Sequence, residues 1–200
     1  MATSDRSGSR GSRQGAGWFR AAYAGLAGFF AIERVFRRPG SAASLAATAD
    51  DQRTTQKIVA AYAAAGVLAP IVRRTRLGRL PPAAAPLGLA IELAGLGLRA
   101  WSMRALGSSY SRTLRTGQGQ ALVDDGPYRL VRHPGYAGSL LTWTGFALVS
   151  RSLPVAAAVG GLLGWAYRDR IRAEEALLRR ELPGYEDYSR RTWRLVPFVW

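Results

Sequence analysis

Apolar residues gather into blocks along this chain, and arginines stand in the gaps between them. The blocks are rich in alanine, leucine, glycine and valine, and they cover residues 21–32, 58–72, 83–98, 137–149 and 153–167. Apolar runs that are bounded by charged residues are typical of membrane helices. The pattern predicts an all-α integral membrane protein with about five transmembrane helices.

The predicted helices extend slightly beyond some of these blocks. They cover residues 18–35, 58–72, 83–103, 136–149 and 153–167. Segment 83–103 is the most convincing span, although Glu92 and Arg99 interrupt it, and a charge inside a membrane usually faces a partner or a cavity. The last two helices form a C-terminal hairpin, and both of its arms are shorter than the roughly 20 residues that a full span prefers.

The chain divides into three parts by composition. Residues 1–17 are mostly serine, glycine, arginine and glutamine, which cannot offset ordering entropy, so we expect a disordered tail. Residues 18–103 hold the N-terminal membrane helices, and residues 104–200 hold the hairpin and the candidate site. Placing the arginine-rich segments 104–135 and 168–200 in the cytoplasm follows the positive-inside rule.

The charge of the chain indicates a membrane partner rather than a nucleic acid. The formal net charge is +15, and Lys57 is the only lysine, so the excess is almost wholly arginine. No basic run interleaves with aromatic residues as a single-strand groove would need. The arginines stand at the ends of apolar segments, where they can meet anionic headgroups. We therefore expect membrane lipids, and no nucleic acid, as partners.

The residue inventory limits the chemistry. The chain has no cysteine, which excludes disulfides, thiolate metal sites and cysteine nucleophiles. His133 is the only histidine, so no zinc site of the usual ligand types is expected. Any reaction is then expected to use a diffusible cofactor or none, and no metal.

Two polar blocks flank the hairpin and carry the candidate site. Residues 126–138 are Gly-Pro-Tyr-Arg-Leu-Val-Arg-His-Pro-Gly-Tyr-Ala-Gly, and residues 170–175 are Arg-Ile-Arg-Ala-Glu-Glu. Polar groups against membrane helices must be paired or used, which favours a small-molecule site at the bilayer surface. His133 precedes Pro134, a pair suited to starting a helix whose free N–H groups attract anions. Arg170 and Glu174 are four residues apart and share a helix face.

These blocks resemble the isoprenylcysteine carboxyl methyltransferase family. The resemblance also includes Leu106-Gly-Ser-Ser-Tyr110, Gln120-Ala-Leu-Val123, and a closing Tyr-x-x-Tyr followed by Pro-Phe, and it covers about residues 100–200. The related phospholipid methyltransferases share the Arg-His-Pro-x-Tyr-x-Gly and Glu-Glu elements. The resemblance implies that S-adenosyl-L-methionine is the cofactor and that the methyl acceptor is the carboxylate of a membrane-embedded, isoprenylcysteine-like small molecule or lipidated protein.

The resemblance also implies a role for individual residues. The implied cofactor-binding residues are Gln120, Ala121, Leu122, Val123, Tyr128, His133, Pro134, Gly135, Tyr136 and Glu174. Arg170 matches the position assigned to the acceptor, and Arg170, Glu174 and His133 are the implied catalytic residues. Tyr128 and Tyr136 could offer ring faces to the sulfonium, a contact worth on the order of 1–2 kcal/mol when desolvated. Eukaryotic members usually have histidine where this chain has Gln120.

Other interpretations stay open at the level of the sequence. The acceptor could be a phospholipid amine, although Arg170 would repel a charged amine. A sterol-reductase-like protein with NADPH in a similar pocket, or an inactive membrane scaffold, would carry similar helices. Arg170 and Glu174 could form a solvated ion pair, and periodicity alone does not choose between Glu174 and Glu175. The arginine- and alanine-rich composition indicates a GC-rich bacterial genome, so we expect the inner membrane, with the active site facing the cytoplasm.

Overall fold

The computed structural model describes residues 5–36, 49–72, 78–107 and 122–200, and all of its regular elements are helices. They are α1 (Asp5–Val35), α2 (Ala49–Val72), α3 (Ala84–Leu106), the 3-10 helix η3 (Gly126–Arg129), α4 (Pro134–Val149), α5 (Leu153–Glu181) and α6 (Tyr185–Arg191). The described residues contain no strand beyond two isolated bridges. The all-α prediction is confirmed.

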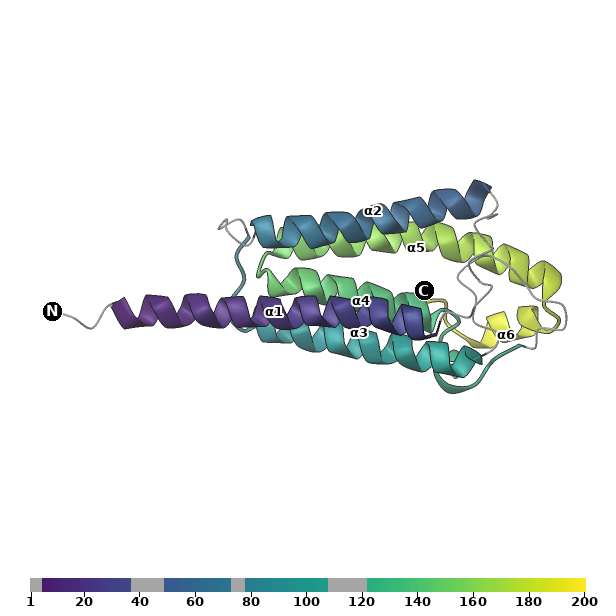
Figure 1. Ribbon diagram of the computed structural model, residues 1–200. Coiled ribbons are helices and arrows are strands. Elements are labelled where there is room, and N and C mark those ends of the chain that lie inside the picture. The colour runs from purple at the N-terminus through teal and green to yellow at the C-terminus, as the bar shows by residue number, and fades with distance from the viewer. Residues whose placement is uncertain (1–4, 37–48, 73–77, 108–121) are drawn as a thin grey trace.

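The long helices lie side by side in one bundle (Figure 1). Helix α2 runs along α5, and α1 runs along α3 and α4. The end of α5 and the short helix α6 lie at one end of the bundle, and η3 lies beside α6, since the Tyr188 hydroxyl donates to the Tyr128 carbonyl. This end is where the two polar blocks of the sequence meet.

Helices α3 and α4 pack with their backbones in contact, because glycines face each other across the interface. A Cβ atom at Gly95 would lie 2.5 Å from the Thr142 nitrogen. A Cβ atom at Gly145 would lie 2.5 Å from the Glu92 nitrogen. Small residues that allow such close approach are typical of helix pairs in membranes.

Aromatic side chains join the remaining helices. The rings of Tyr62 on α2 and Trp143 on α4 stack with centroids 4.2 Å apart. The hydroxyl groups of Tyr62 and Tyr167 lie 2.5 Å apart and link α2 to α5. Phe29 of α1 packs edge-on against both Tyr62 and Trp143. The resulting core lies next to the polar end of the bundle.

The bundle exposes apolar side chains and buries polar ones, as expected for helices in lipid. Large apolar residues that are about half exposed lie on all five long helices and include Phe30, Val67, Leu93, Leu141 and Trp165. Among the described residues, one helical segment, Thr54–Val72, is long and apolar enough to cross a membrane by itself. Helix α4 has only 16 residues, and α3 contains Glu92 and Arg99. The number of spans remains a prediction.

The helices are longer than the apolar blocks predicted. Helix α1 begins at Asp5, within the segment 1–17 for which the composition predicts disorder. Helix α2 begins at Ala49, and α5 continues to Glu181, well past residue 167. Alanine, arginine, glutamine and glutamate all sustain a helix once it has started. The apolar blocks therefore mark where a helix meets lipid or its neighbours, and not where it ends.

Candidate functional site

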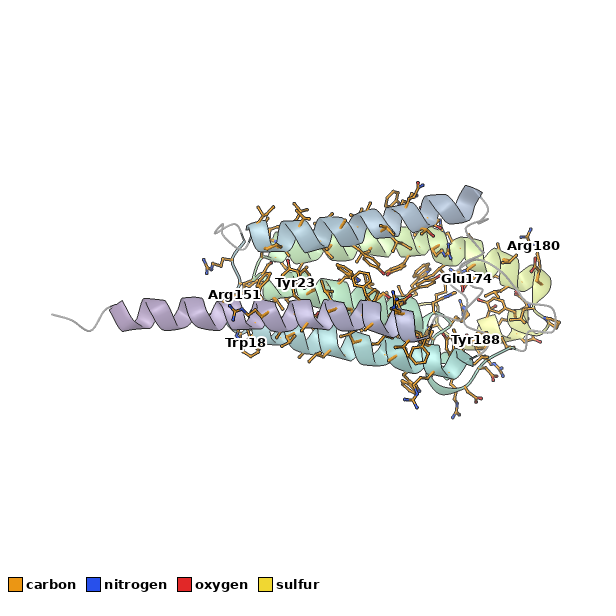
Figure 2. All side chains as sticks on the ribbon, in the orientation of Figure 1. Trp18, Tyr23, Arg151, Glu174, Arg180 and Tyr188 are labelled. Atoms are coloured by element: carbon orange, nitrogen blue, oxygen red, sulfur yellow. The ribbon has the colours of Figure 1, made fainter. Side chains whose placement is uncertain are left out.

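A cavity of about 530 Å³ opens at the polar end of the bundle. This volume falls within the range of roughly 300–1,000 Å³ that is usual for small-molecule sites. All five long helices, together with η3 and α6, contribute to its walls. Glu174 and Tyr188 lie at this end, whereas Arg151 lies at the opposite end (Figure 2).

Most of the residues predicted for the site meet in this one cavity. They are Leu122, Val123, Tyr128, His133, Gly135, Tyr136, Arg170 and Glu174. Pro134 is buried in the first turn of α4 and does not line the cavity. Gln120 and Ala121 lie outside the described residues. The predicted convergence of the histidine–proline turn with the last long helix is therefore seen in the structure.

The histidine–proline pair starts α4, as the sequence predicts. His133 is the N-cap residue, with φ −122° and ψ 54°, and Pro134 follows it in the first turn. The carbonyl of His133 accepts hydrogen bonds from the amides of Tyr136 and Ala137, both at 3.1 Å. The helix start thereby places Gly135 and Tyr136 in the cavity wall.

Arg170 and Glu174 are joined through a tyrosine hydroxyl. Tyr136 Oη donates to Glu174 Oε2 at 2.7 Å, and Arg170 Nε donates to the same hydroxyl at 3.3 Å. A second guanidinium nitrogen of Arg170 donates to Thr54 Oγ1 at 3.2 Å. Arg170 is only 4% exposed. The two residues share a face as predicted, but the burial of Arg170 excludes a solvated surface pair.

Arg99 is the intramembrane charge that the sequence analysis expected to face a partner or a cavity, and it does both. Its guanidinium forms a mostly buried ion pair with Glu33 of α1. It also donates to the carbonyl of Gly135 at 2.8 Å and to Ser139 Oγ at 2.5 Å. Both Arg99 and Glu33 line the cavity. Glu33 was not predicted as a site residue, because in the sequence it follows an apolar block as an ordinary flanking charge does.

Glu175 was also missed, and it lies behind the cavity wall. Its side chain is 2% exposed, and its oxygens accept from Arg132 Nε at 2.9 Å and from Arg194 Nε at 3.0 Å. His133 Nε2 lies 3.5 Å from Glu175 Oε1. Burial raises the pKa of Glu175, but the interactions with His133 and Arg132 outweigh burial and hold the pKa at about 2. The carboxylate is therefore charged at any physiological pH.

Comparison with known proteins identifies the segment that carries these residues. Residues 88–180 match the model of the isoprenylcysteine carboxyl methyltransferase family. This segment belongs to that family. The match includes η3, α4 and the cavity-facing part of α5 together with most of α3, whereas α1 and α2 lie outside it.

Relatives that match this segment have two kinds of name. A probable protein-S-isoprenylcysteine O-methyltransferase of Oryza sativa subsp. indica is 30% identical over 117 residues, which are 56% of this chain and 61% of that protein. The nickel-cobalt-cadmium resistance protein NccN of Alcaligenes xylosoxydans xylosoxydans is 36% identical over 76 residues, 38% of this chain and 36% of that protein. The chain thus spans between about a third and two thirds of the length of these relatives.

The fold of the methyltransferase family is also recognisable in three dimensions. The solved structure of the eukaryotic intramembrane Ras methyltransferase superposes with a TM-score of 0.60 at 22% identity. The superposition covers 70% of this chain and 52% of that chain. At this identity, the likeness shows a shared fold.

The cavity contains groups that suit the cofactor of this methyltransferase family, S-adenosylmethionine. One buried polar atom of a lining residue, Tyr185 Oη, has no hydrogen-bond partner among the described residues. A bound molecule with amino, hydroxyl and carboxylate groups would supply a partner. Tyr128 and Tyr188 add aromatic surface, and the Tyr188 hydroxyl donates to the Tyr128 carbonyl at 2.8 Å. Burial raises the pKa of Tyr188 to about 12, so its hydroxyl stays neutral.

Proposed function

We propose that the chain is an S-adenosylmethionine-dependent methyltransferase that acts on the carboxylate of a lipophilic, isoprenylcysteine-like acceptor in the membrane. The observation that carries this proposal is the composition of one cavity. His133 and Glu174 lie in its polar part, Phe30 and Val59 form part of an apolar wall, and a buried cation, Arg170, lies among them. We further propose that the active site faces the cytoplasm of a bacterial inner membrane.

The apolar wall supports a lipophilic acceptor. Phe30 of α1 and Val59 of α2 both line the cavity, yet they are 53% and 58% exposed. Each therefore borders both the cavity and the outer surface of the bundle. In a membrane that surface is in contact with hydrocarbon, so a lipid-like tail could reach the cavity from the bilayer.

Arg170 supports a carboxylate as the accepting group. Its guanidinium lies in the cavity wall and is held by Tyr136 and Thr54. A guanidinium binds a carboxylate through charge-assisted hydrogen bonds, and it repels a protonated amine. A buried cation at this place therefore favours a carboxylate over a phospholipid amine.

The remaining lining residues suit cofactor binding. When bound, S-adenosylmethionine would supply an electrophilic methyl carbon, to which a carboxylate oxygen would bond as the carbon–sulfur bond breaks and S-adenosylhomocysteine leaves, with no proton transferred. Glu174 would accept from amino or hydroxyl groups, and the N-terminus of α4 would hold a carboxylate. The apolar and aromatic walls exclude water, and alignment of the reactants supplies much of the acceleration.

Ligand binding and product chemistry test the proposal together. Detergent-purified protein is titrated calorimetrically with S-adenosylhomocysteine and, separately, with NADPH. It is then incubated with methyl-labelled S-adenosylmethionine and a bacterial lipid extract. We expect binding of S-adenosylhomocysteine and labelled lipid that releases methanol in alkali, as a methyl ester does. Alkali-stable label would indicate an amine acceptor, binding of NADPH alone a reductase, and binding of neither a scaffold.

A further inference from the structure

We propose that Glu175 is the positioning residue of this site, since it fixes the histidine–proline turn against the end of the chain. The inference rests on the proposed function, because the turn in question forms part of the proposed cofactor site. Glu174 and Glu175 thus have different tasks, although they are neighbours in the sequence. Glu174 faces the cavity, whereas Glu175 holds the wall from behind.

The helix geometry separates the two carboxylates. Successive residues of an α-helix point about 100° apart around its axis. Glu174 accordingly meets Tyr136, at the cavity. Glu175 meets a cluster of basic residues on the other side, namely Arg132, His133, Arg179 and Arg194.

The cluster joins two irregular segments that pair with each other through their backbones. The amide of Arg132 donates to the carbonyl of Trp193 at 2.7 Å, and the amide of His133 donates to the carbonyl of Arg194 at 3.0 Å. The amide of Trp193 donates to the carbonyl of Leu130 at 3.0 Å. Backbone hydrogen bonds therefore hold residues 130–133 and 193–194 together.

Glu175 ties this unit to α5 through one arginine from each segment. Its Oε1 accepts from Arg132, and its Oε2 accepts from Arg194. Arg132 extends the link, because its guanidinium also donates to the carbonyl of Ser189 at 2.6 Å and to that of Thr192. A single buried carboxylate thus connects α5, the α4 start and the segment after α6.

Loss of the Glu175 charge should change the geometry of the site in addition to lowering the stability of the bundle. Arg132 has a side chain that is 7% exposed, so it would lose a buried ionic partner and would have to move. His133 follows it directly and begins the turn that forms the cavity wall. A displacement of about 1 Å at such a site can cost on the order of 100-fold in function.

The test compares Glu175→Gln with Glu174→Gln in the full chain in detergent. Calorimetry gives the Kd for S-adenosylhomocysteine well below the unfolding temperature, where lower global stability alone does not change the Kd. Hydrogen exchange is followed at residues 130–136 and 192–195. Glu186→Gln is the matched control, because its side chain is 56% exposed and its ion pairs with Arg179 and Arg190 lie on the surface.

We expect Glu175→Gln to raise the Kd by about 10- to 100-fold and to speed exchange in both segments. Glu174→Gln should raise the Kd without changing exchange there, and Glu186→Gln should change neither. Unchanged exchange in Glu175→Gln, or a Kd within about twofold of the parent, would overturn the inference. Glu175→Gln combined with Arg132→Gln should weaken binding by less than the product of the single effects, because both remove the same link.

Two further outcomes keep the inference separate from the proposed function. If the parent protein binds no S-adenosylhomocysteine, the proposed function fails, and the exchange rates alone decide whether Glu175 fixes the turn. If Glu175→Gln does not fold, Arg194→Gln is tested in its place. The Arg194 guanidinium is partly exposed, and among the ion pairs of Glu175 this substitution removes only the one with Arg194. Arg194→Gln should also raise the Kd and speed hydrogen exchange in both segments, but by less than Glu175→Gln. Unchanged exchange would refute the role of Glu175.

Discussion

The charge of Glu175 should make the free energy of unfolding depend on pH in the acid range. The substitution Glu175→Gln should remove this dependence. The pKa of this carboxyl falls from an ordinary value of 4.5 to about 2 in the folded protein. Each pKa unit corresponds to about 1.4 kcal/mol. The ionised carboxylate therefore contributes about 3 kcal/mol to the free energy of unfolding at neutral pH.

The sign follows from which state binds the proton first. Between pH 4.5 and about 2, the carboxyl is protonated in the unfolded chain while it is still ionised in the folded one. The stabilisation is therefore complete above this interval and is lost as the pH falls through it. Glu175→Gln lacks this stabilisation at every pH, so the difference in stability between the two proteins should shrink as the pH falls.

Thermal unfolding of the two proteins in detergent measures the effect. At neutral pH, we expect the Tm of Glu175→Gln to lie roughly 6–12 °C below that of the parent, at about 2–4 °C per kcal/mol for a chain of this size. The gap should narrow steadily below about pH 4.5 and largely close near pH 2. Glu186→Gln, at an exposed ion pair, should show almost no gap at any pH. A gap for Glu175→Gln that is equally wide at about pH 3 and at neutral pH would refute the reasoning.

Three further substitutions test the site and the bundle. Glu174→Ala should weaken S-adenosylhomocysteine binding at least about tenfold by calorimetry, because it removes an acceptor group from the cavity wall; an unchanged Kd would place the cofactor elsewhere. Arg170→Gln should reduce methyl transfer to the lipid extract by about tenfold or more while leaving that Kd within about threefold, since a charge-assisted bond to the acceptor is lost; equal losses in both would contradict separate roles. Gly95→Ala should lower stability by about 1–3 kcal/mol in thermal unfolding, because its Cβ would lie 2.5 Å from a backbone nitrogen of α4. Gly97→Ala is the control, since nothing lies within 4 Å of its Cβ, and it should be neutral or stabilising.

The sequence predicted those features that depend on local pattern. Apolar blocks placed all five long helices, and the order of the motifs brought His133 and Glu174 to one cavity. Features that depend on distant partners were missed. Glu33 looks like a flanking charge until α1 lies beside Arg99, and Glu175 cannot be told from Glu174 until the segment after α6 folds back onto α5.

Helices α1 and α2 lie outside the family match but contribute to the same cavity. We therefore expect residues of these helices to influence which acceptor the protein uses. Residues 88–180 carry the family match, yet α2 supplies Thr54 as a partner of Arg170 and Val59 to the apolar wall. Val59→Trp should therefore obstruct this wall and lower methyl transfer to lipid, while the Kd for S-adenosylhomocysteine stays the same.

Val67→Trp is the matched control for this last prediction. Both valines are on α2 and are 58% exposed, but Val67 does not line the cavity. The two variants add the same bulk to the same helix, so any difference between them reports the cavity. Equal methyl transfer by both would show that the acceptor does not pass Val59. A weaker Kd in Val59→Trp alone would show instead that this part of the cavity holds the cofactor.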